Sequence, residues 1–272
     1  MKEDFLEELS VKENGDQEKI IEDLSSDNLS PDEIQELQKR TNMLNKYCLD
    51  NGILVVTLVD DKYPELLKAS DMPPMVLFTK GNLALLNEEL VWVYGDNYAM
   101  SSKNDVECSA IKIALDAKAS NKVCVTTDVT AVDLVVQQTC KKIDSPSILI
   151  LTDSFDGDHL ASNARHDIIQ TTLDNNGLVM TLYPEQKGGG IDESIIRLMS
   201  DLLNDLVIVS LQQKTDAETK QLCNWKTHFN VQVVFHPIYA MEKNAANDFA
   251  IKEGLKPYIG FPKKEILKST NK

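Results

Sequence analysis

The sequence predicts a mixed α/β fold, in which a doubly wound, mostly parallel sheet carries a small helical appendage at the N-terminus. Seven apolar runs have the length of a strand, and most are separated by stretches long enough for a helix. Because these runs are continuously apolar and do not alternate, each strand is expected to be buried on both faces. Strand–helix alternation is typical of a parallel sheet with helices on each side. The runs are residues 53–59, 90–94, 122–126, 147–152, 178–183, 206–211 and 231–235.

Residues 1–28 contain two short apolar stripes that are separated at Asn14-Gly15-Asp16, a strong break. They predict a pair of short helices packed on the main domain, with a disordered segment as the alternative. Ser30-Pro31-Asp32-Glu33 then has the pattern of a capped helix start, and apolar residues recur at helical spacing as far as Asn51-Gly52.

Three further helices are expected, with apolar faces over Val106–Ala117, Val132–Cys140 and Ile191–Leu203. The chain therefore divides into an acidic helical segment (1–50), a main domain (51–260) and a basic C-terminal tail (261–272). In a doubly wound sheet, ligands bind beyond the carboxyl ends of the strands. This places candidate functional segments at residues 95–97, 127–130, 153–158, 186–190 and 212–218.

The composition of the 272 residues indicates a cytoplasmic globular protein with no membrane contact. No run of apolar residues is long enough for a transmembrane helix, and the acidic N-terminus does not resemble a signal peptide. The five cysteines have no CxxC spacing, which favours reduced thiols.

The net charge of −15 argues against a general nucleic-acid binder, because phosphate binding depends on Lys and Arg. The charge is concentrated in the first 37 residues, which hold 13 acidic and three basic residues, whereas Lys252–Lys272 holds six lysines and two acids. Only three arginines occur, at positions 40, 165 and 197. Arg is the preferred residue for bidentate phosphate and base contacts, so its scarcity argues against strong DNA binding.

Two glycine segments fit loops better than phosphate sites. Gly95-Asp96-Asn97 lacks the GxGxxG pattern, and the acidic residue would repel a phosphate, so a plain strand-to-helix turn is the favoured interpretation. Gly188-Gly189-Gly190 lacks the Lys-Ser or Lys-Thr of a P-loop and fits a flexible connection.

No group of residues forms a convincing catalytic or metal-binding pattern. Asp153, Asp156 and Asp158 lack the closing Glu of a calcium loop and are expected to be solvated loop residues. The four histidines lack zinc-site spacing, and no Ser or Cys stands in a nucleophile motif. We therefore expect no catalytic residues, no metal, no cofactor and no enzymatic activity.

The segment after the first strand resembles the DprA/Smf family of DNA-processing proteins. The resemblance rests on three consecutive segments: Asp60-Asp61-Lys62-Tyr63-Pro64 with Leu67, then Pro73-Pro74-Met75-Val76-Leu77-Phe78, then Lys80-Gly81-Asn82. The similarity extends over roughly residues 34–260. The family's V-G-S-R motif falls on Tyr94–Asn97, and its S-G-x-A-x-G-I-D-x-x-A-H motif on Thr126–Gln137. In the second motif Asp133 is kept, whereas the two glycines are Thr127 and Ala131 and the histidine is Gln137.

The resemblance implies a Rossmann-like domain that binds single-stranded DNA, associates as a homodimer and assists the loading of a RecA-type recombinase in DNA uptake and transformation. It also implies no catalytic residue and no required cofactor. Two alternatives remain open: a protein-interaction module without direct DNA binding, and a Rossmann-type nucleotide binder. The DNA-binding residues expected on this resemblance, together with basic residues near the same edge, are Gly95, Asn97, Lys103, Asn163, Arg165, Arg197 and Lys214.

Overall fold

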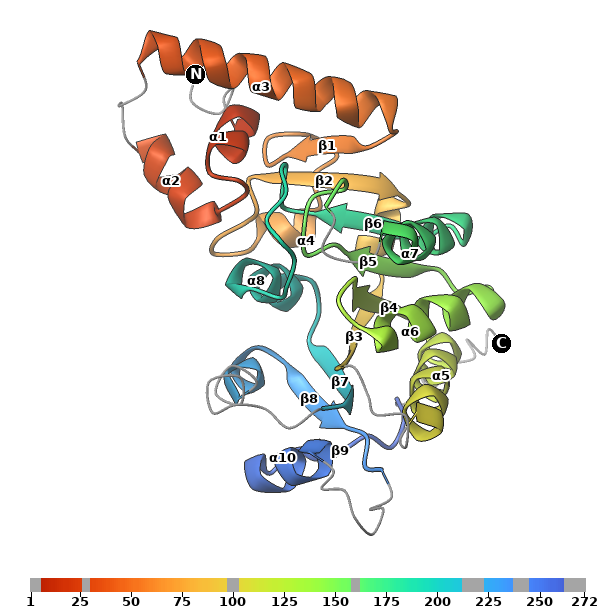
Figure 1. Ribbon diagram of the computed structural model, residues 1–272. Coiled ribbons are helices and arrows are strands. Elements are labelled where there is room, and N and C mark those ends of the chain that lie inside the picture. The colour runs from red at the N-terminus through yellow and green to blue at the C-terminus, as the bar shows by residue number, and fades with distance from the viewer. Residues whose placement is uncertain are drawn as a thin grey trace, which may run out of the picture.

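A nine-stranded sheet forms the centre of the molecule in a computed structural model (Figure 1). The structure describes residues 6–25, 30–96, 103–157, 162–211, 223–236 and 245–261. The strand order is β1-β2-β6-β5-β4-β3-β7-β8-β9. The strands are β1 (Leu54–Thr57), β2 (Val76–Gly81), β3 (Glu89–Gly95), β4 (Lys122–Thr127), β5 (Ser147–Ile150), β6 (Leu178–Thr181), β7 (Asp205–Ser210), β8 (Asn230–Val233) and β9 (Lys256–Pro257).

The sheet is doubly wound and mostly parallel, as the sequence predicts. Strand β2 runs antiparallel to both its neighbours, β1 and β6, whereas all other pairings are parallel. From β3 the chain adds β4, β5 and β6 on one side and then returns to add β7 and β8 on the other. The strand order therefore reverses between β3 and β7, and a crevice at such a point is where this architecture binds ligands.

Strand β2, like the two-residue strand β9, lies outside the apolar runs. Its first half, Val76–Phe78, is buried, but Thr79, Lys80 and Gly81 continue the strand with polar residues. The polar half is held by pairing on both sides, with β1 and with β6. Pairing with two strands thus overrides a composition that is atypical of a central strand.

Helices cover both faces of the sheet. One face carries α5, α6 and α7, and at its β1–β2 end also α1–α3, while α4, α8, the helical residues 223–228 and α10 pack on the other. The helices are α1 (Leu6–Lys12), α2 (Gln17–Ser25), α3 (Pro31–Asp50), α4 (Glu65–Lys68), α5 (Lys103–Ala119), α6 (Ala131–Lys142), α7 (Ser162–Asp174), α8 (Glu193–Leu202) and α10 (Ala245–Glu253), with a 3₁₀ turn η2 (Leu83–Asn87).

The N-terminal helices pack on the main domain, which confirms the first of the two interpretations of this segment. Leu6, Leu9 and Ile20 are buried together with Val76 and Phe78 of β2. Ser30 caps α3 with the complete capping box that its sequence predicts, because its side chain accepts from the Glu33 amide while Glu33 accepts from the Ser30 amide.

Strand β3 shows why its apolar run is continuous. Leu90, Trp92 and Tyr94 face the α8 side, and Val91 and Val93 face α5 and α6. Trp225 and Phe229 pack in the core against Trp92, with ring centroids 4.9 and 5.4 Å away. In the described part of the chain, no helix is long and apolar enough to cross a bilayer.

Candidate nucleic-acid interface

The candidate site lies at the carboxyl edge of the parallel strands, and its centre is the reversal point between β3 and β7. Asp96 follows β3, and its amide donates to the Ser210 carbonyl at the end of β7 (3.1 Å). The Ser210 hydroxyl donates in return to the Asp96 carbonyl (3.1 Å). A Cβ added to Gly95 would lie 2.8 Å from Val132 Cγ2 and 2.9 Å from Ser210 Oγ. The glycine therefore serves close packing of β3 on α6 and β7.

A buried ion pair fixes the next loop along this edge. Asp128, just after β4, accepts from the amide and the hydroxyl of Thr152 at the end of β5 (both 2.9 Å). The same carboxylate accepts from Arg165 Nε at 3.1 Å. The Arg165 guanidinium also donates to the carbonyls of Phe155, Gly157 and Ser154. Since Arg165 is 3% exposed, its donors are used to hold the loop after β5.

Asp133 organises the turn between β4 and α6. It is fully buried and accepts from the amides and hydroxyls of Thr127 and Thr130, with distances between 2.8 and 3.2 Å. Burial raises the pKa of Asp133 to about 7, against the opposing effect of the hydrogen bonds from Thr130 and Thr127. These hydrogen bonds of its side chain stabilise the turn and the N-terminal cap of α6.

Asp153 anchors the glycine loop, which corrects the expectation that it is a solvated loop residue. It is fully buried and accepts from the amides of Lys187 (2.6 Å) and Gly188 (3.1 Å). Gly190 donates its amide to the Thr152 hydroxyl (3.1 Å). A connection expected to be flexible is thus tied to the end of β5, because buried carboxylates at the sheet edge need donors and the loop amides supply them.

The glycine loop leaves room for a ligand to approach its backbone. Gly188, Gly189 and Gly190 all have positive φ, at 97°, 70° and 109°. A Cβ built on Gly188 or Gly190 meets nothing within 4 Å. The loop therefore presents an open backbone surface beside the exposed Lys187.

Helix α8 follows this loop. Asp192 caps it by accepting from the Ile195 amide (3.0 Å), and it also accepts from the Tyr183 hydroxyl (2.8 Å) and from Lys187 Nζ. Burial alone would raise the pKa of Asp192, but the hydrogen bonds from Lys187, Ile195 and Tyr183 lower it below the usual value. Lys187 Nζ also lies over the Tyr183 ring, 4.3 Å from its centroid.

Arg197 lies one turn further along α8. Its guanidinium donates to Glu18 of α2 (3.2 Å) and contacts Met72 Sδ. Glu18, Arg197 and Lys187 line a cavity of 260 Å³ between the N-terminal helices and α8. The N-terminal segment therefore borders the basic residues of this edge.

The sequence-predicted site residues do not gather in one cluster within the described residues. Gly95 lies at the reversal point. Arg165 of α7 is buried against the loop after β5, and Arg197 lies on α8, after the glycine loop. Lys103 begins α5 and forms an ion pair with Glu107 at 3.8 Å. Asn163 lies in α7, but its side chain is outside the described residues, as are the whole of Asn97 and Lys214. Their DNA-binding roles stay predictions.

Every arginine of the chain is paired with a carboxylate. Arg40 pairs with Glu185 (2.7 Å), Arg165 with Asp128 (3.1 Å) and Arg197 with Glu18 (3.2 Å). The sequence places Asp128 in a candidate edge segment, directly after β4, but does not predict its burial or its ion pair with Arg165. Within the described residues, no group of three or more His, Cys, Asp or Glu side chains could hold a metal ion.

Comparison with known proteins decides the family. The family model for DNA recombination-mediator protein A matches residues 54–256, which reach from the start of β1 to the first residue of β9. This chain belongs to that family. No curated protein matches the sequence.

Two solved structures of this family share the fold. DNA processing protein A (DprA) from Streptococcus pneumoniae superposes with a TM-score of 0.62 at 19% identity, over 96% of this chain and 90% of the other. The Helicobacter pylori DprA, described for its unique single-stranded DNA binding mode, superposes with a TM-score of 0.56 at 18% identity, over 76% of this chain and 91% of the other. Both confirm the doubly wound architecture.

The DprA motif that falls on Thr126–Gln137 has become a buried polar network. Gln137, at the histidine position, donates to the Thr126 hydroxyl (2.7 Å) and accepts from the hydroxyls of Ser147 and Thr172. Gln137 is 1% exposed, so it connects β4, β5 and α7 inside the protein. The retained Asp133 likewise holds the turn. In this DprA-family chain, the polar residues Asp133 and Gln137 of the motif form hydrogen bonds within the protein and stabilise its fold.

Proposed function

We propose that the chain binds single-stranded DNA along the carboxyl edge of its sheet, between the β3–β7 reversal point and the start of α8. Family membership over residues 54–256 carries this proposal. It is supported by the open backbone of the glycine loop and by Lys187 and Arg197 beside it. Single strands bind without sequence preference in grooves that combine backbone contacts with positive charge.

The same proposal includes the role of a recombination mediator. The protein would hold a single strand, act by binding without catalysis, and pass the strand to a RecA-type recombinase in the cytoplasm as a homodimer. The family description as a recombination mediator supports this step. Light scattering of the purified chain tests the dimer, and a strand-exchange assay with and without the chain tests the transfer.

The ion pairs of the basic residues with carboxylates determine the expected strength of DNA binding. Arg197 must exchange Glu18 for a phosphate, and Lys187 must exchange Asp192. With two or three phosphate contacts, the slope of log K against log salt should be about −2. Binding should therefore weaken roughly tenfold between low and physiological salt.

Fluorescence anisotropy of a labelled single-stranded oligonucleotide at two salt concentrations tests the proposal. Arg197→Gln should weaken binding, and Glu18→Gln should strengthen it about threefold, because a surface ion pair that competes with the phosphate is worth up to about 1 kcal/mol. Glu88→Gln, an exposed carboxylate before β3 at the opposite edge, is the matched charge control and should change nothing. Absence of binding at low salt contradicts the proposal.

A protein-interaction module without direct DNA binding is the second candidate. The pairing of all three arginines with carboxylates favours it, because a phosphate then finds no free guanidinium. In that case the wild type and Glu18→Gln would both fail to bind the oligonucleotide at low salt, and the strongly acidic N-terminal helices would be the surface that meets a basic partner protein.

A further inference from the structure

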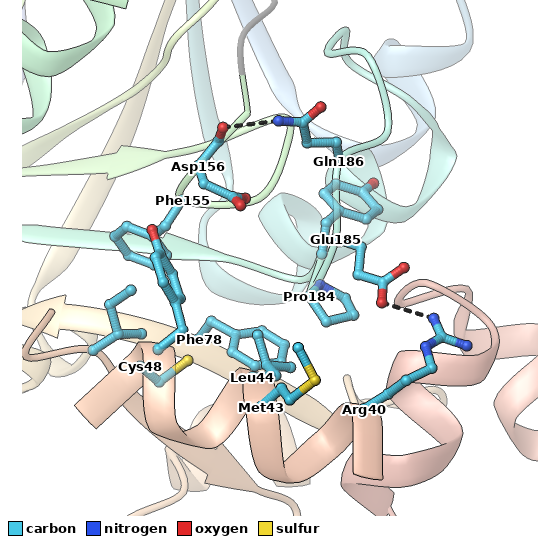
Figure 2. A pocket seen from close by; sticks show the side chains of 13 residues that line it. Arg40, Met43, Leu44, Cys48, Phe78, Phe155, Asp156, Pro184, Glu185 and Gln186 are labelled. Atoms are coloured by element: carbon cyan, nitrogen blue, oxygen red, sulfur yellow. Dashed lines mark hydrogen bonds and ion pairs between the residues drawn. The ribbon is translucent and has the colours of Figure 1, made fainter. Parts of the chain in front are cut away.

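A second cavity lies next to the proposed DNA path. It measures 320 Å³ and lies between α3, strand β2 and the loops that follow β5 and β6 (Figure 2). This size is near the lower end of the range of small-molecule pockets, roughly 300–1,000 Å³. The cavity suits one small planar group better than a whole nucleotide.

The deep part of the cavity is apolar and aromatic. Phe78 of β2 and Tyr183 after β6 are buried, and Cys48 of α3 lies beside them. Phe155, from the loop after β5, forms the wall opposite Leu44 of α3 (Figure 2). Aromatic and apolar walls of this kind stack with nucleobases, because every base has a π-face.

The mouth of the cavity carries the polar groups. Asp156 accepts from the Ser154 hydroxyl through Oδ1 (2.6 Å), which orients the carboxyl group. Its Oδ2 has no hydrogen-bond donor among the described residues, and Figure 2 shows the carboxyl group turned into the cavity. Tyr47, 36% exposed, lines the same mouth, and its hydroxyl has no hydrogen-bond partner among the described residues. Burial raises the pKa of Tyr47, and the Asp156 carboxylate raises it further, so the hydroxyl keeps its proton as a donor.

Charge decides which group can enter. Arg40 and Glu185 on the rim neutralise each other at 2.7 Å, so Asp156 leaves the cavity with one net negative charge. A phosphate is therefore repelled, whereas a base that offers an amino group finds an acceptor. Cytosine and adenine combine an amino donor with a neighbouring ring-nitrogen acceptor, which match Asp156 and the Tyr47 hydroxyl respectively.

The cavity adjoins the loop that borders the proposed DNA path. Gln186 lines it and donates to the Asp156 carbonyl (3.0 Å), and the next residues are Lys187 and the open glycine loop. A strand that runs along that loop has its phosphates outside and can turn one base inward.

We propose that this cavity is a nucleobase pocket that selects an amino-bearing base, with Asp156 accepting from the amino group, Tyr47 donating to the ring nitrogen and Phe155 stacking on the ring. For a base within a DNA strand the inference rests on the proposed function. A free nucleoside has the same chemistry, and the two sources are separated by experiment.

The test compares oligo(dC) with oligo(dT). Each oligonucleotide is about 20 nucleotides long, so that it spans the whole binding site of one protein molecule. Both are pyrimidines, but thymine presents O4 where cytosine presents its amino group. Anisotropy with the full-length chain should show about tenfold tighter binding of oligo(dC), the size of one good polar base contact. Asp156→Asn should reduce this preference to nearly one. Met43→Trp, at a mouth position that is 67% exposed, should block entry and also remove the preference. Glu88→Gln should keep it.

The remaining arm uses free 2′-deoxycytidine, measured by its effect on the thermal unfolding temperature. Stabilisation of the wild type that is lost in Asp156→Asn supports the pocket for a free nucleoside even if strands show no preference. Equal binding of oligo(dC) and oligo(dT) without stabilisation by deoxycytidine overturns the pocket and leaves the proposed function intact. If neither strand binds, the proposed function fails, and the deoxycytidine result alone decides the pocket.

Discussion

At the scale of single residues, the carboxyl edge is made of carboxylates that the protein satisfies internally. Asp128, Asp133 and Asp153 are each at most 1% exposed, and each collects donors from a loop that follows a different strand. They hold the surface that a DNA strand would contact, and their oxygens accept hydrogen bonds from groups within the protein. Sequence reasoning could place these residues at the edge but not inside it, because burial depends on amides contributed by distant loops.

Arg165 supplies the first residue-scale prediction. Arg165→Met should reduce the free energy of unfolding by about 3 kcal/mol or more, because it leaves the buried Asp128 without its positive partner. Chemical denaturation measures the loss, and the double variant Arg165→Met/Asp128→Asn should recover part of it. A change below about 1 kcal/mol would show that Arg165 is free for another role, including the DNA contact expected from the resemblance.

Asp133 supplies a pH-dependent prediction. Its pKa is about 7 in the folded protein against an ordinary value of 3.8, so the folded state holds a proton that the unfolded state has released. The resulting stability is fully present below about pH 4 and is lost as the pH rises through 7. The stability difference between the wild type and Asp133→Asn should therefore shrink by about 2–3 kcal/mol between pH 5 and pH 8. A constant difference over this range would mean that Asp133 is ionised throughout.

At the scale of elements, the N-terminal helices are joined to the main domain at a few identifiable points. Asn14 donates to the Gln186 carbonyl and accepts from the Glu185 amide, and Gln17 accepts from the Met75 amide. The helices themselves could be predicted from two apolar stripes and a break. Their docking on the loop after β6 could not, since Asn14 and Glu185 are 171 residues apart in sequence.

Gly15, in the turn between α1 and α2, tests this docking. Gly15→Ala should release both helices, because the residue has φ +76° and a Cβ there would lie 2.3 Å from the Leu182 carbonyl oxygen. Limited trypsin digestion should then cut faster at Lys12 and Lys19. Gly254→Ala is the matched control, since it has a similar φ of +64° and nothing within 4 Å of the added Cβ. This control carries the backbone strain of about 1 kcal/mol that Ala has at positive φ, but not the steric clash with Leu182. Equal cleavage of both variants and the wild type would show that the turn does not hold the helices.

At the scale of the whole molecule, the acidic N-terminal helices lie beside the basic residues Lys187 and Arg197 at the carboxyl edge of the sheet. The chain carries a net charge of −15, concentrated in its first 37 residues, and the first helices lie against α8 and the loop that holds Lys187. Continuous apolar runs were sufficient to predict the doubly wound sheet. The ion pairs of the basic residues depend on which distant carboxylates reach them in the folded protein, and composition alone does not contain that information.

In the proposed binding mode, single-stranded DNA follows the carboxyl edge past the glycine loop. Hydrogen–deuterium exchange of the full chain, with and without a saturating single-stranded oligonucleotide at low salt, tests it most directly. We predict slower exchange in residues 186–190 and in the first turn of α8, with no change in the outer helices α5 and α6. Protection confined to those outer helices, or no protection in any part of the chain, would contradict the claim.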